Sequence, residues 1–146
     1  MLRIVVLMLV AGFSSPSFGW ERYDQYEEDR FEARFEIFDD VALTFLCPDK
    51  QRQLPAAIEY WHWKDKTART VEFIIDGKLI FNVDLSHKNQ FDRNQFRADT
   101  SGNKIKFDAI VEALKKGSEL VVNSPGKAPV TISLKGSSAA LKDCRA

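Results

Sequence analysis

Apolar and polar residues alternate along much of the first half of the chain. The stretch FEARFEI, residues 31–37, places its apolar side chains on one side and its charged side chains on the other, and VALTFLC, residues 41–47, has a similar pattern. A period of two residues is typical of a β-strand with one face toward a core and the other toward water. Further strands are predicted from Ile58 to Trp63, in TVEFIIDG and in KLIFNVDL, which indicates a meander of antiparallel strands.

The length of the turn after TVEFII decides which apolar side chains of the two flanking strands share a face. With a two-residue turn, Val71 and Phe73 would point away from Phe81. With a three-residue loop at 75–77, in which Gly77 takes the left-handed conformation, they lie on the same face as Phe81. We favour the three-residue loop because it makes one continuous apolar face.

The tetrapeptide YWHW, residues 60–63, contains two of the three tryptophans of the chain. A hairpin across the following KDKT would pair Tyr60 with Val71, which makes Tyr60 a core residue and places Trp61 and Trp63 on the other face. Two indoles at this spacing lie about 7 Å apart on a strand and can hold a sugar ring or an apolar side chain. The alternative is that the helix predicted below, or a second sheet, covers them.

Two helices are predicted in the second half of the chain. FDAIVEALKKG has apolar residues at helical spacing over about 107–116, lysines in its last turn and Gly117 as a C-cap, with Asp108 in the first turn. The strands ELVVN and PVTISLKG follow, and SSAALKDC then predicts a short C-terminal helix capped by Ser137 or Ser138. The chain therefore reads as a mainly β, antiparallel β-sandwich with one clear helix and a short C-terminal one.

The polar stretch at 86–106 predicts a long connection. It carries turn signals between Asp99 and Asn103, and Phe91 and Phe96 are the residues that would anchor it to the core. Its charged residues make it a second candidate site, represented by Asp92, Arg93 and Arg97.

The first 19 residues have the layout of a secretory signal peptide. One basic residue, Arg3, precedes an apolar run that ends at Phe13 and is followed by small residues up to Gly19. The run is too short for a permanent membrane helix, which argues against the alternative of an uncleaved anchor. Residues 20–40 are predicted to form an N-terminal lead-in, acidic and on the surface from Tyr23 to Arg30, and then the first strand. Residues 41–146 form the sandwich, in a single domain with 31–40.

The net charge and the length of the chain argue against nucleic acid and stable membrane insertion as modes of action. Without residues 1–19 the chain has 127 residues with 20 basic and 21 acidic side chains, a formal charge of −1. A near-neutral chain lacks the basic surface of a nucleic-acid-binding protein, and no later segment is long enough for stable membrane insertion. The length suits one domain with a single core.

Cys47 and Cys144 are the only cysteines. In an oxidising compartment an even pair without metal-ligand spacing predicts a disulfide. A metal site or a reactive thiol is the alternative, but the chain has no CxxC motif and its two histidines, His62 and His87, stand apart. We expect a periplasmic or secreted protein with one disulfide.

The C-terminal half resembles a known family. A helix ending in LKKG, a strand, a turn, a strand ending in SLKG and a final AAL segment are similar to the bacterial invasion-associated locus B family of small exported proteins. VALTFLC, VEFIIDG and the closing Cys144 also resemble periplasmic accessory proteins of type VI secretion of the VasI kind. The resemblance covers about residues 41–144 and implies a sandwich-like domain in an exported envelope or virulence-associated factor of a Gram-negative bacterium. Residues 21–40 and 86–106 match neither pattern, and the resemblance supplies no catalytic residue.

Catalytic and metal-binding patterns do not stand out. His62 is expected on the core side of a strand end without a nucleophile motif nearby, and His87 in a solvated connection. The acidic residues lack the spacing of an EF-hand, and the glycines occur singly, so we expect neither a metal nor another cofactor. A hydrolase is the least favoured class.

The sequence thus predicts a non-enzymatic exported protein that binds a protein or a cell-wall glycan in the envelope. Its candidate binding residues are Tyr60, Trp61 and Trp63, together with the three charged residues of the polar connection. The alternative is a periplasmic inhibitor or accessory of a secretion system or a cell-wall enzyme, in which the connection at 86–106 is the functional element.

Overall fold

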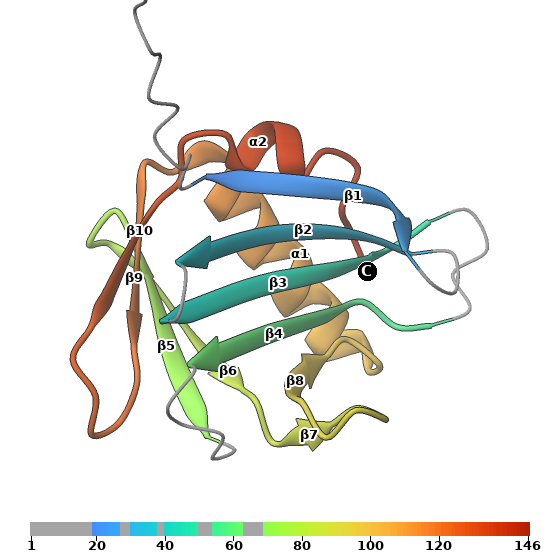
Figure 1. The fold of residues 1–146 in the computed structure, drawn as a ribbon, viewed down its shortest axis with the longest axis horizontal. Helices are drawn as coiled ribbons and strands as arrows, with labels where there is room; N and C mark the ends of the chain where they lie inside the picture. Colours follow the sequence, from blue (N-terminus) through green and yellow to red (C-terminus); the bar gives the residue numbers. More distant parts are fainter. Residues whose placement is uncertain (1–18, 27–29, 38–39, 50–53, 63–68) are drawn as a thin grey trace, which may run out of the picture.

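The computed structural model describes residues 19–26, 30–37, 40–49, 54–62 and 69–146. They form a β-sandwich of two antiparallel sheets with two helices, closed by a disulfide (Figure 1). The predicted fold class is confirmed. The proposed signal peptide lies outside the described residues, apart from Gly19.

The larger sheet has six strands in the order β1-β2-β3-β4-β8-β7. Its bounds are β1 (Trp20–Tyr26), β2 (Arg30–Ile37), β3 (Val41–Pro48), β4 (Ala57–His62), β8 (Asn94–Arg97) and β7 (His87–Lys88). Strands β2 and β3 pair along their whole length because both have the predicted alternation with one apolar face.

The smaller sheet has four strands in the order β10-β9-β5-β6. Its bounds are β10 (Val130–Ser133), β9 (Glu119–Asn123), β5 (Thr70–Ile75) and β6 (Leu79–Asp84). The β5–β6 hairpin has the predicted three-residue loop length, but the loop is 76–78, one residue later than expected. Gly77 is left-handed with φ 66°, and Val71 and Phe73 pair with Val83 and Phe81, so the predicted shared face is confirmed.

The predicted hairpin between β4 and β5 is wrong. β4 pairs with β3 and β8, whereas β5 pairs with β6 and β9 in the other sheet. The turn sequence KDKT falls at 64–67, outside the described residues. Parity still assigned the faces correctly, since Tyr60 is buried and Trp61 is only partly buried. Side-chain alternation reports which face is apolar, but it cannot distinguish a hairpin partner from a partner in a facing sheet.

The first strand corrects the predicted acidic lead-in. Residues 20–26 form the edge strand β1, which pairs with β2. Tyr23 is exposed as expected, but the Trp20 ring packs against the rings of Phe35 and Phe45 at 5.9 and 6.2 Å. The Trp20 indole nitrogen also donates to the carbonyl of Ser133 on β10 at 3.0 Å, so this strand ties the two sheets together.

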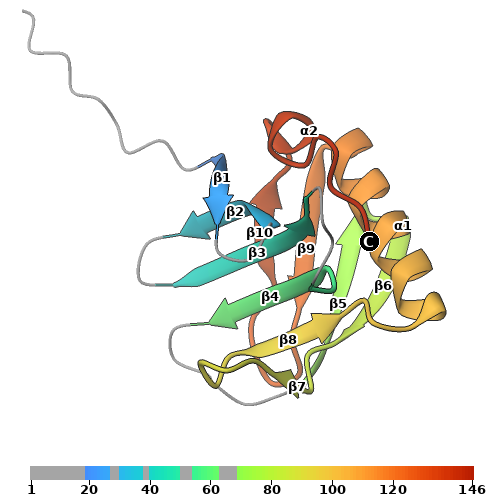
Figure 2. The same ribbon diagram turned by 90° about the vertical axis from the view of Figure 1, so that its right-hand side faces the viewer.

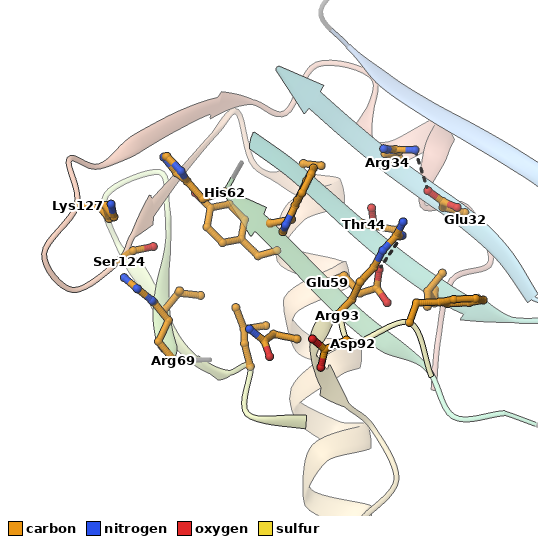
Figure 3. Close-up of a pocket in the computed structure, with 18 residues that line it drawn as sticks. Glu32, Arg34, Thr44, Glu59, His62, Arg69, Asp92, Arg93, Ser124 and Lys127 are labelled. Carbon is orange, nitrogen blue, oxygen red and sulfur yellow. Dashed lines mark ion pairs between the residues drawn. The ribbon is translucent and has the colours of Figure 1, made fainter. Parts of the chain in front are cut away.

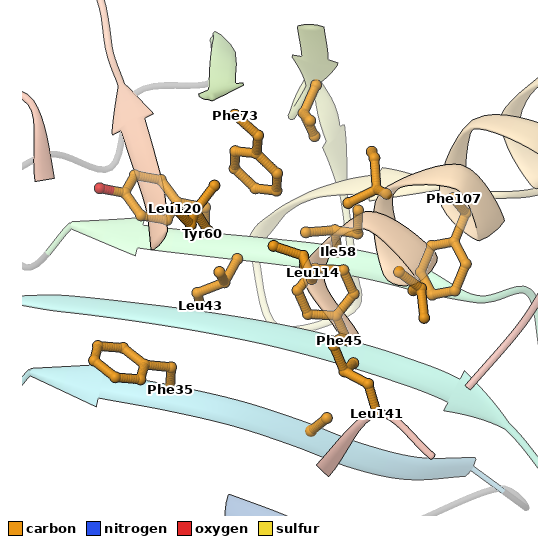
Figure 4. Packing of buried hydrophobic residues seen from close by; sticks show 14 of the residues in the cluster. Phe35, Leu43, Phe45, Ile58, Tyr60, Phe73, Phe107, Leu114, Leu120 and Leu141 are labelled. Atoms are coloured by element: carbon orange, nitrogen blue, oxygen red, sulfur yellow. The ribbon is translucent and has the colours of Figure 1, made fainter. Parts of the chain in front are cut away.

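The core lies between the inner faces of the two sheets and the side of helix α1 (Ser101–Lys116) that faces them (Figure 4). Figures 1 and 2 show α1 on the same side of the six-stranded sheet as β5 and β6. Phe45 and Phe107 are fully buried and their ring centres are 6.0 Å apart, which joins α1 to the larger sheet. This packing places α1 on the face opposite to Trp61.

Helix α1 begins six residues before the predicted start. Thr100 is the N-cap, and its hydroxyl accepts from the backbone N–H of Asn103 at 3.2 Å. The predicted turn at 99–103 is therefore wrong, because polar residues that favour turns also favour helix N-termini. Asp108 consequently lies inside the helix, where its carboxylate accepts from the backbone N–H of Ala146 at 2.7 Å. The four apolar residues of the predicted stripe are buried as expected, namely Phe107, Ile110, Val111 and Leu114.

The short C-terminal helix α2 (Ser137–Ala140) is present, but its N-cap is Gly136 and neither predicted serine caps it. Instead, the buried Ser137 hydroxyl donates to the carbonyl of Leu114 at 2.7 Å and holds α2 against α1. The predicted disulfide is confirmed, with Cys47 and Cys144 bonded and their Cα atoms 5.0 Å apart.

Gly117 is the C-cap of α1, but it is not left-handed, with φ −79°. A glycine is needed there because a Cβ would lie 2.7 Å from a methyl of Ile75 and 2.9 Å from a methyl of Leu134. We expect Gly117→Ala to lower the free energy of unfolding by about 1–3 kcal/mol through overpacking. Urea unfolding followed by circular dichroism measures the change.

Gly102 provides a matched control in the first turn of the same helix, because no heavy atom lies within 4 Å of a Cβ built there. Gly102→Ala should raise the free energy of unfolding by about 0.5 kcal/mol, since alanine loses less conformational freedom on folding. Equal effects of the two substitutions would contradict the role assigned to the close approach at Gly117.

Candidate functional site

A cavity of about 440 Å³ opens beside the outer end of β4. The pairing of β4 with β8 covers only Ala57 to Glu59, so Tyr60, Trp61 and His62 lie beyond the end of β8 and face this space. The cavity has the size of a small-molecule site and is bordered by groups from both sheets (Figure 3).

The floor of the cavity is the outer face of the six-stranded sheet. It is built by alternate residues of three adjacent strands, namely Glu32, Arg34, Thr44, Glu59 and Trp61. Three of these polar side chains are nevertheless buried, with Glu32 and Thr44 at 7% exposed and Glu59 at 9%. A side chain on the outer face of a sheet is ordinarily exposed to solvent. The burial of these three side chains therefore shows that other parts of the chain enclose the sheet face here.

Glu59 is held by the connection between β7 and β8. One carboxylate oxygen accepts from the side-chain amide of Asn89 at 2.9 Å, and the other lies 3.9 Å from the guanidinium of Arg93. Burial raises the pKa of the Glu59 carboxyl, and Arg93 and the Asn89 hydrogen bond oppose this rise only in part. The carboxyl is therefore largely desolvated, and Asn89 is its one close hydrogen-bond partner among the described residues.

Glu32 is held more loosely. The guanidinium of Arg34 lies 3.8 Å from one Glu32 oxygen but 3.0 Å from a Glu36 oxygen, so Arg34 pairs more closely with Glu36. Burial raises the pKa of the Glu32 carboxyl, and the charges of Arg34 and Arg93 lower it by less. Arg93 thus acts on both buried carboxyls of the floor.

The wall that carries Phe91, Asp92 and Arg93 is a compact turn. The side-chain oxygen of Asn89 accepts from the backbone N–H groups of Phe91 and Arg93 at 2.8 and 3.0 Å, and its backbone N–H donates to the Arg93 carbonyl at 2.9 Å. Asp92 is left-handed with φ 60° and pairs with Lys88 at 2.6 Å. The connection predicted to be long is thus an ordered turn between two short strands. Phe96 is buried as expected, but Phe91 is 64% exposed and is not an anchor.

The opposite wall comes from β4, β5 and the β9–β10 hairpin, with Arg69, Ser124 and Lys127 at the left of Figure 3. Burial, with the charge of Asp40, raises the pKa of the Tyr60 hydroxyl to about 12, and its hydrogen bond with Ser124 opposes the rise. The His62 imidazole lies 3.5 Å from an Asp40 carboxylate oxygen. The guanidinium of Arg69 donates to the carbonyl of Pro125 at 2.9 Å, which connects β5 to the hairpin.

The structure brings together four of the six predicted binding residues. Tyr60, Trp61, Asp92 and Arg93 all line the cavity, so the two candidate sites, which the sequence placed in separate segments, are one. Trp63 lies outside the described residues. Arg97 does not line the cavity and lies 3.9 Å from Asp99.

Sequence analysis missed the two buried glutamates. Glu32 occupies a polar position of the alternating stretch at 31–37, where a charged residue ordinarily signals a wet face. Glu59 stands between Ile58 and Tyr60, and its position directly before the aromatic cluster is the one signal that could have pointed to it.

No family model, curated protein or solved structure matches this chain. Among the described residues, no group of three or more histidine, cysteine or acidic side chains is arranged to hold a metal ion. No helix in the same residues is both long and apolar enough to cross a membrane. The disulfide fits a protein that works outside the cytoplasm.

The burial of Glu59 should make stability depend on pH. Because the folded-state pKa lies above the ordinary value of 4.5, the folded chain holds this proton more tightly than the unfolded chain does. The free energy of unfolding therefore falls as the pH rises from about 4.5 through the folded-state pKa. We expect urea unfolding to show that Glu59→Gln gains stability relative to the native chain as the pH rises above about 4.5 and through the folded-state pKa of Glu59.

Substitution of Arg93 gives a second test of this dependence of stability on pH. Arg93 lowers the pKa of Glu59, so Arg93→Gln should extend to higher pH the range over which stability falls. A constant stability difference between Glu59→Gln and the native chain over the whole range would contradict the assigned titration.

Proposed function

We propose that this chain is a non-enzymatic, exported bacterial envelope protein that binds a ligand in the cavity beside β4. The observation that carries the proposal is the enclosure of polar side chains on an outer sheet face, which brings the predicted aromatic and loop residues into one site. Buried polar groups cost free energy unless they are satisfied, so such a surface is expected where a ligand completes their hydrogen bonds.

Binding is favoured over catalysis because the site is built from mutually fixed groups. Glu59 is held by Asn89 and Arg93, and the Tyr60 hydroxyl is bonded to Ser124 with its pKa raised to about 12. A raised pKa alone does not make Glu59 a general acid or base, because acid–base or nucleophilic chemistry also requires a positioned reacting partner. Rigid, paired side chains are instead suited to positioning a ligand.

Export is supported by the signal-like pattern of residues 1–19 and by the buried Cys47–Cys144 disulfide. The resemblance to invasion-associated and secretion-accessory proteins adds a proposed role in virulence, invasion or secretion. Expression of the full chain in a Gram-negative host, followed by fractionation and mass determination, tests this. The expected product lacks about the first 19 residues and lies outside the cytoplasm. An uncleaved cytoplasmic product would overturn the proposed export.

Occupation of the cavity tests the proposed binding. Thr44 lies on the floor, so Thr44→Trp should fill the cavity, whereas Thr131→Trp places the same side chain at an exposed position of β10. The oxidised mature protein is immobilised and exposed to soluble peptidoglycan fragments and to periplasmic extract. We expect saturable binding that Thr44→Trp abolishes and Thr131→Trp preserves. No binding from either source, or equal binding by both variants, would contradict the proposal.

A second candidate function rests on the turn at 89–93. This turn is closed by its own hydrogen bonds and presents the Phe91 ring, 64% exposed, at the rim of the cavity. A rigid turn with an exposed aromatic residue suits an inhibitor or accessory that inserts into a cell-wall enzyme or a secretion component. Under this alternative, Phe91→Ala should weaken capture of the partner from the extract, while Thr44→Trp should leave it unchanged.

A further inference from the structure

We propose that the ligand of the cavity is a neutral glycan chain, with a sugar ring against Trp61 and its hydroxyl groups bonded to the pairs Glu32–Arg34 and Glu59–Arg93. This inference rests on the proposed binding function and names its ligand class. Figure 3 shows both pairs, marked by dashed lines, on the floor of the cavity and at its edge.

The charges of the floor favour a neutral, hydrogen-bonding ligand. Two carboxylates supply acceptors and two guanidiniums supply donors, and the whole lining mixes both signs, with four basic side chains (Arg34, Arg69, Arg93 and Lys127) against three acidic ones (Glu32, Glu59 and Asp92). A sugar hydroxyl donates and accepts at once, and it can therefore bridge a carboxylate and a guanidinium. A cationic ligand would be repelled by Arg34 and Arg93, and an anionic ligand by Glu32 and Glu59.

Within each pair the guanidinium and the carboxylate lie too far apart to hydrogen-bond to each other, although Glu59 accepts from Asn89 and Arg34 pairs with Glu36. The guanidinium-to-carboxylate distances of 3.8 and 3.9 Å exceed the range of a direct hydrogen bond. The Glu32 side chain is only 9% exposed and accepts no hydrogen bond from the described residues other than through this distant pair. A hydroxyl placed between the members of each pair would supply the missing hydrogen bonds, which are strong because one partner is charged.

The position of the floor favours a glycan over an extended peptide. Peptides commonly bind by adding a strand to a free sheet edge. Glu32 and Thr44 lie instead on β2 and β3, which are paired with neighbouring strands on both sides. Over Glu32 and Thr44 a ligand meets side chains rather than free backbone groups, and the edge of β4 that β8 leaves unpaired beside the cavity is only Tyr60 to His62, which is short for the addition of a peptide strand.

Aromatic residues complete the site for a sugar. Trp61 is partly buried on the floor, and Phe91 stands exposed at the rim. The C–H face of a sugar ring is apolar, and aromatic side chains bury it while polar groups bond the hydroxyls at its edge. Both aromatic residues line the cavity of about 440 Å³.

Calorimetric titration of the oxidised mature protein tests the ligand class with four probes. These are a β-1,4-linked N-acetylglucosamine tetramer, a glucose oligomer of similar length, an oligogalacturonate and free peptidoglycan stem peptides. We expect one of the two neutral glycans to bind and the other probes to bind at least about tenfold more weakly. The first two probes distinguish a cell-wall-type glycan from other neutral glycans.

The double variant Glu32→Gln and Glu59→Gln keeps the shape of the floor and removes its two negative charges. It should weaken glycan binding at least about tenfold, since charge-assisted hydrogen bonds become neutral ones. Glu72→Gln is the matched control, because Glu72 also accepts from an asparagine side chain, Asn123 at 3.1 Å, but lies in the other sheet and outside the cavity. We expect this control to bind the glycan as the native chain does.

A measurement on the native chain avoids any effect of substitution on folding. Amide and indole signals in nitrogen–proton spectra should shift with the glycan at Thr44, Trp61 and Arg93, and not at Thr131. Tight binding of stem peptides or oligogalacturonate alone would overturn the glycan assignment and leave the binding function standing. Glycan binding that survives the double variant would also overturn it. If none of the probes binds and the extract experiment is negative as well, both proposals fail.

Discussion

Loss of the Cys47–Cys144 bond is expected to lower the free energy of unfolding by about 4–5 kcal/mol. The two cysteines are 97 residues apart in the sequence, so the bond closes a loop that contains nearly the whole sandwich. A crosslink across so long a loop removes much of the conformational freedom of the unfolded chain. Both cysteines are buried, so the fold also protects the bond from reductants.

The measurement is urea unfolding of the oxidised chain, the reduced chain and the double variant Cys47→Ala and Cys144→Ala. The reduced chain and the double variant should unfold at similar urea concentrations, well below the oxidised chain. A reductant should not affect the double variant, which serves as the control. An unchanged unfolding midpoint in the reduced chain would contradict the stabilising role of the bond.

Phe45→Ala should cost about 3–5 kcal/mol of unfolding free energy, because it opens a cavity at the centre of the core. Phe45 is fully buried on β3, and its ring packs against Trp20 of β1 at 6.2 Å and Phe107 of α1 at 6.0 Å. A single ring thus joins the edge strand, the middle of the larger sheet and the helix, and Figure 4 shows Phe45 together with Phe107 of the helix. Thermal and urea unfolding measure the loss.

Phe91→Ala is the matched control for this stability measurement. It removes the same side chain from a position that is 64% exposed, where the expected change is within about 0.5 kcal/mol. If the two substitutions destabilised the fold equally, the assignment of Phe45 to the core and of Phe91 to the rim would be wrong.

Part of the site could be predicted because strand alternation is local. The period of two residues placed Tyr60 on the apolar face and Trp61 on the other, and both placements hold in the structure. The polar turn at 86–106 was recognised as a candidate site from its composition. That Asp92 and Arg93 would lie beside Trp61 could not be predicted, because it depends on the pairing of β8 with β4, two strands separated by a hairpin of the other sheet.

The sequence by itself determined the local properties of this protein. The apolar stripe of α1, the shared face of the β5–β6 hairpin and the joining of the only two cysteines all follow from spacing and residue type. Each of these three features depends on residues nearby in the chain or on the absence of any other thiol. They can therefore be predicted without knowledge of the strand order in the sheets.

Only the tertiary structure decided which strands meet and which polar residues are enclosed. β4 lies between β3 and β8 rather than beside β5, and this order brings Asn89 and Arg93 over Glu59. Glu32 and Glu59 occupy positions that the sequence pattern assigns to the solvent-exposed face, yet both are buried in the fold, where Asn89 and Arg93 of that turn contact Glu59. The alternation of apolar and polar residues predicts which face of a strand a side chain occupies. Whether that face is buried depends on long-range packing, and the candidate site depends on the same packing.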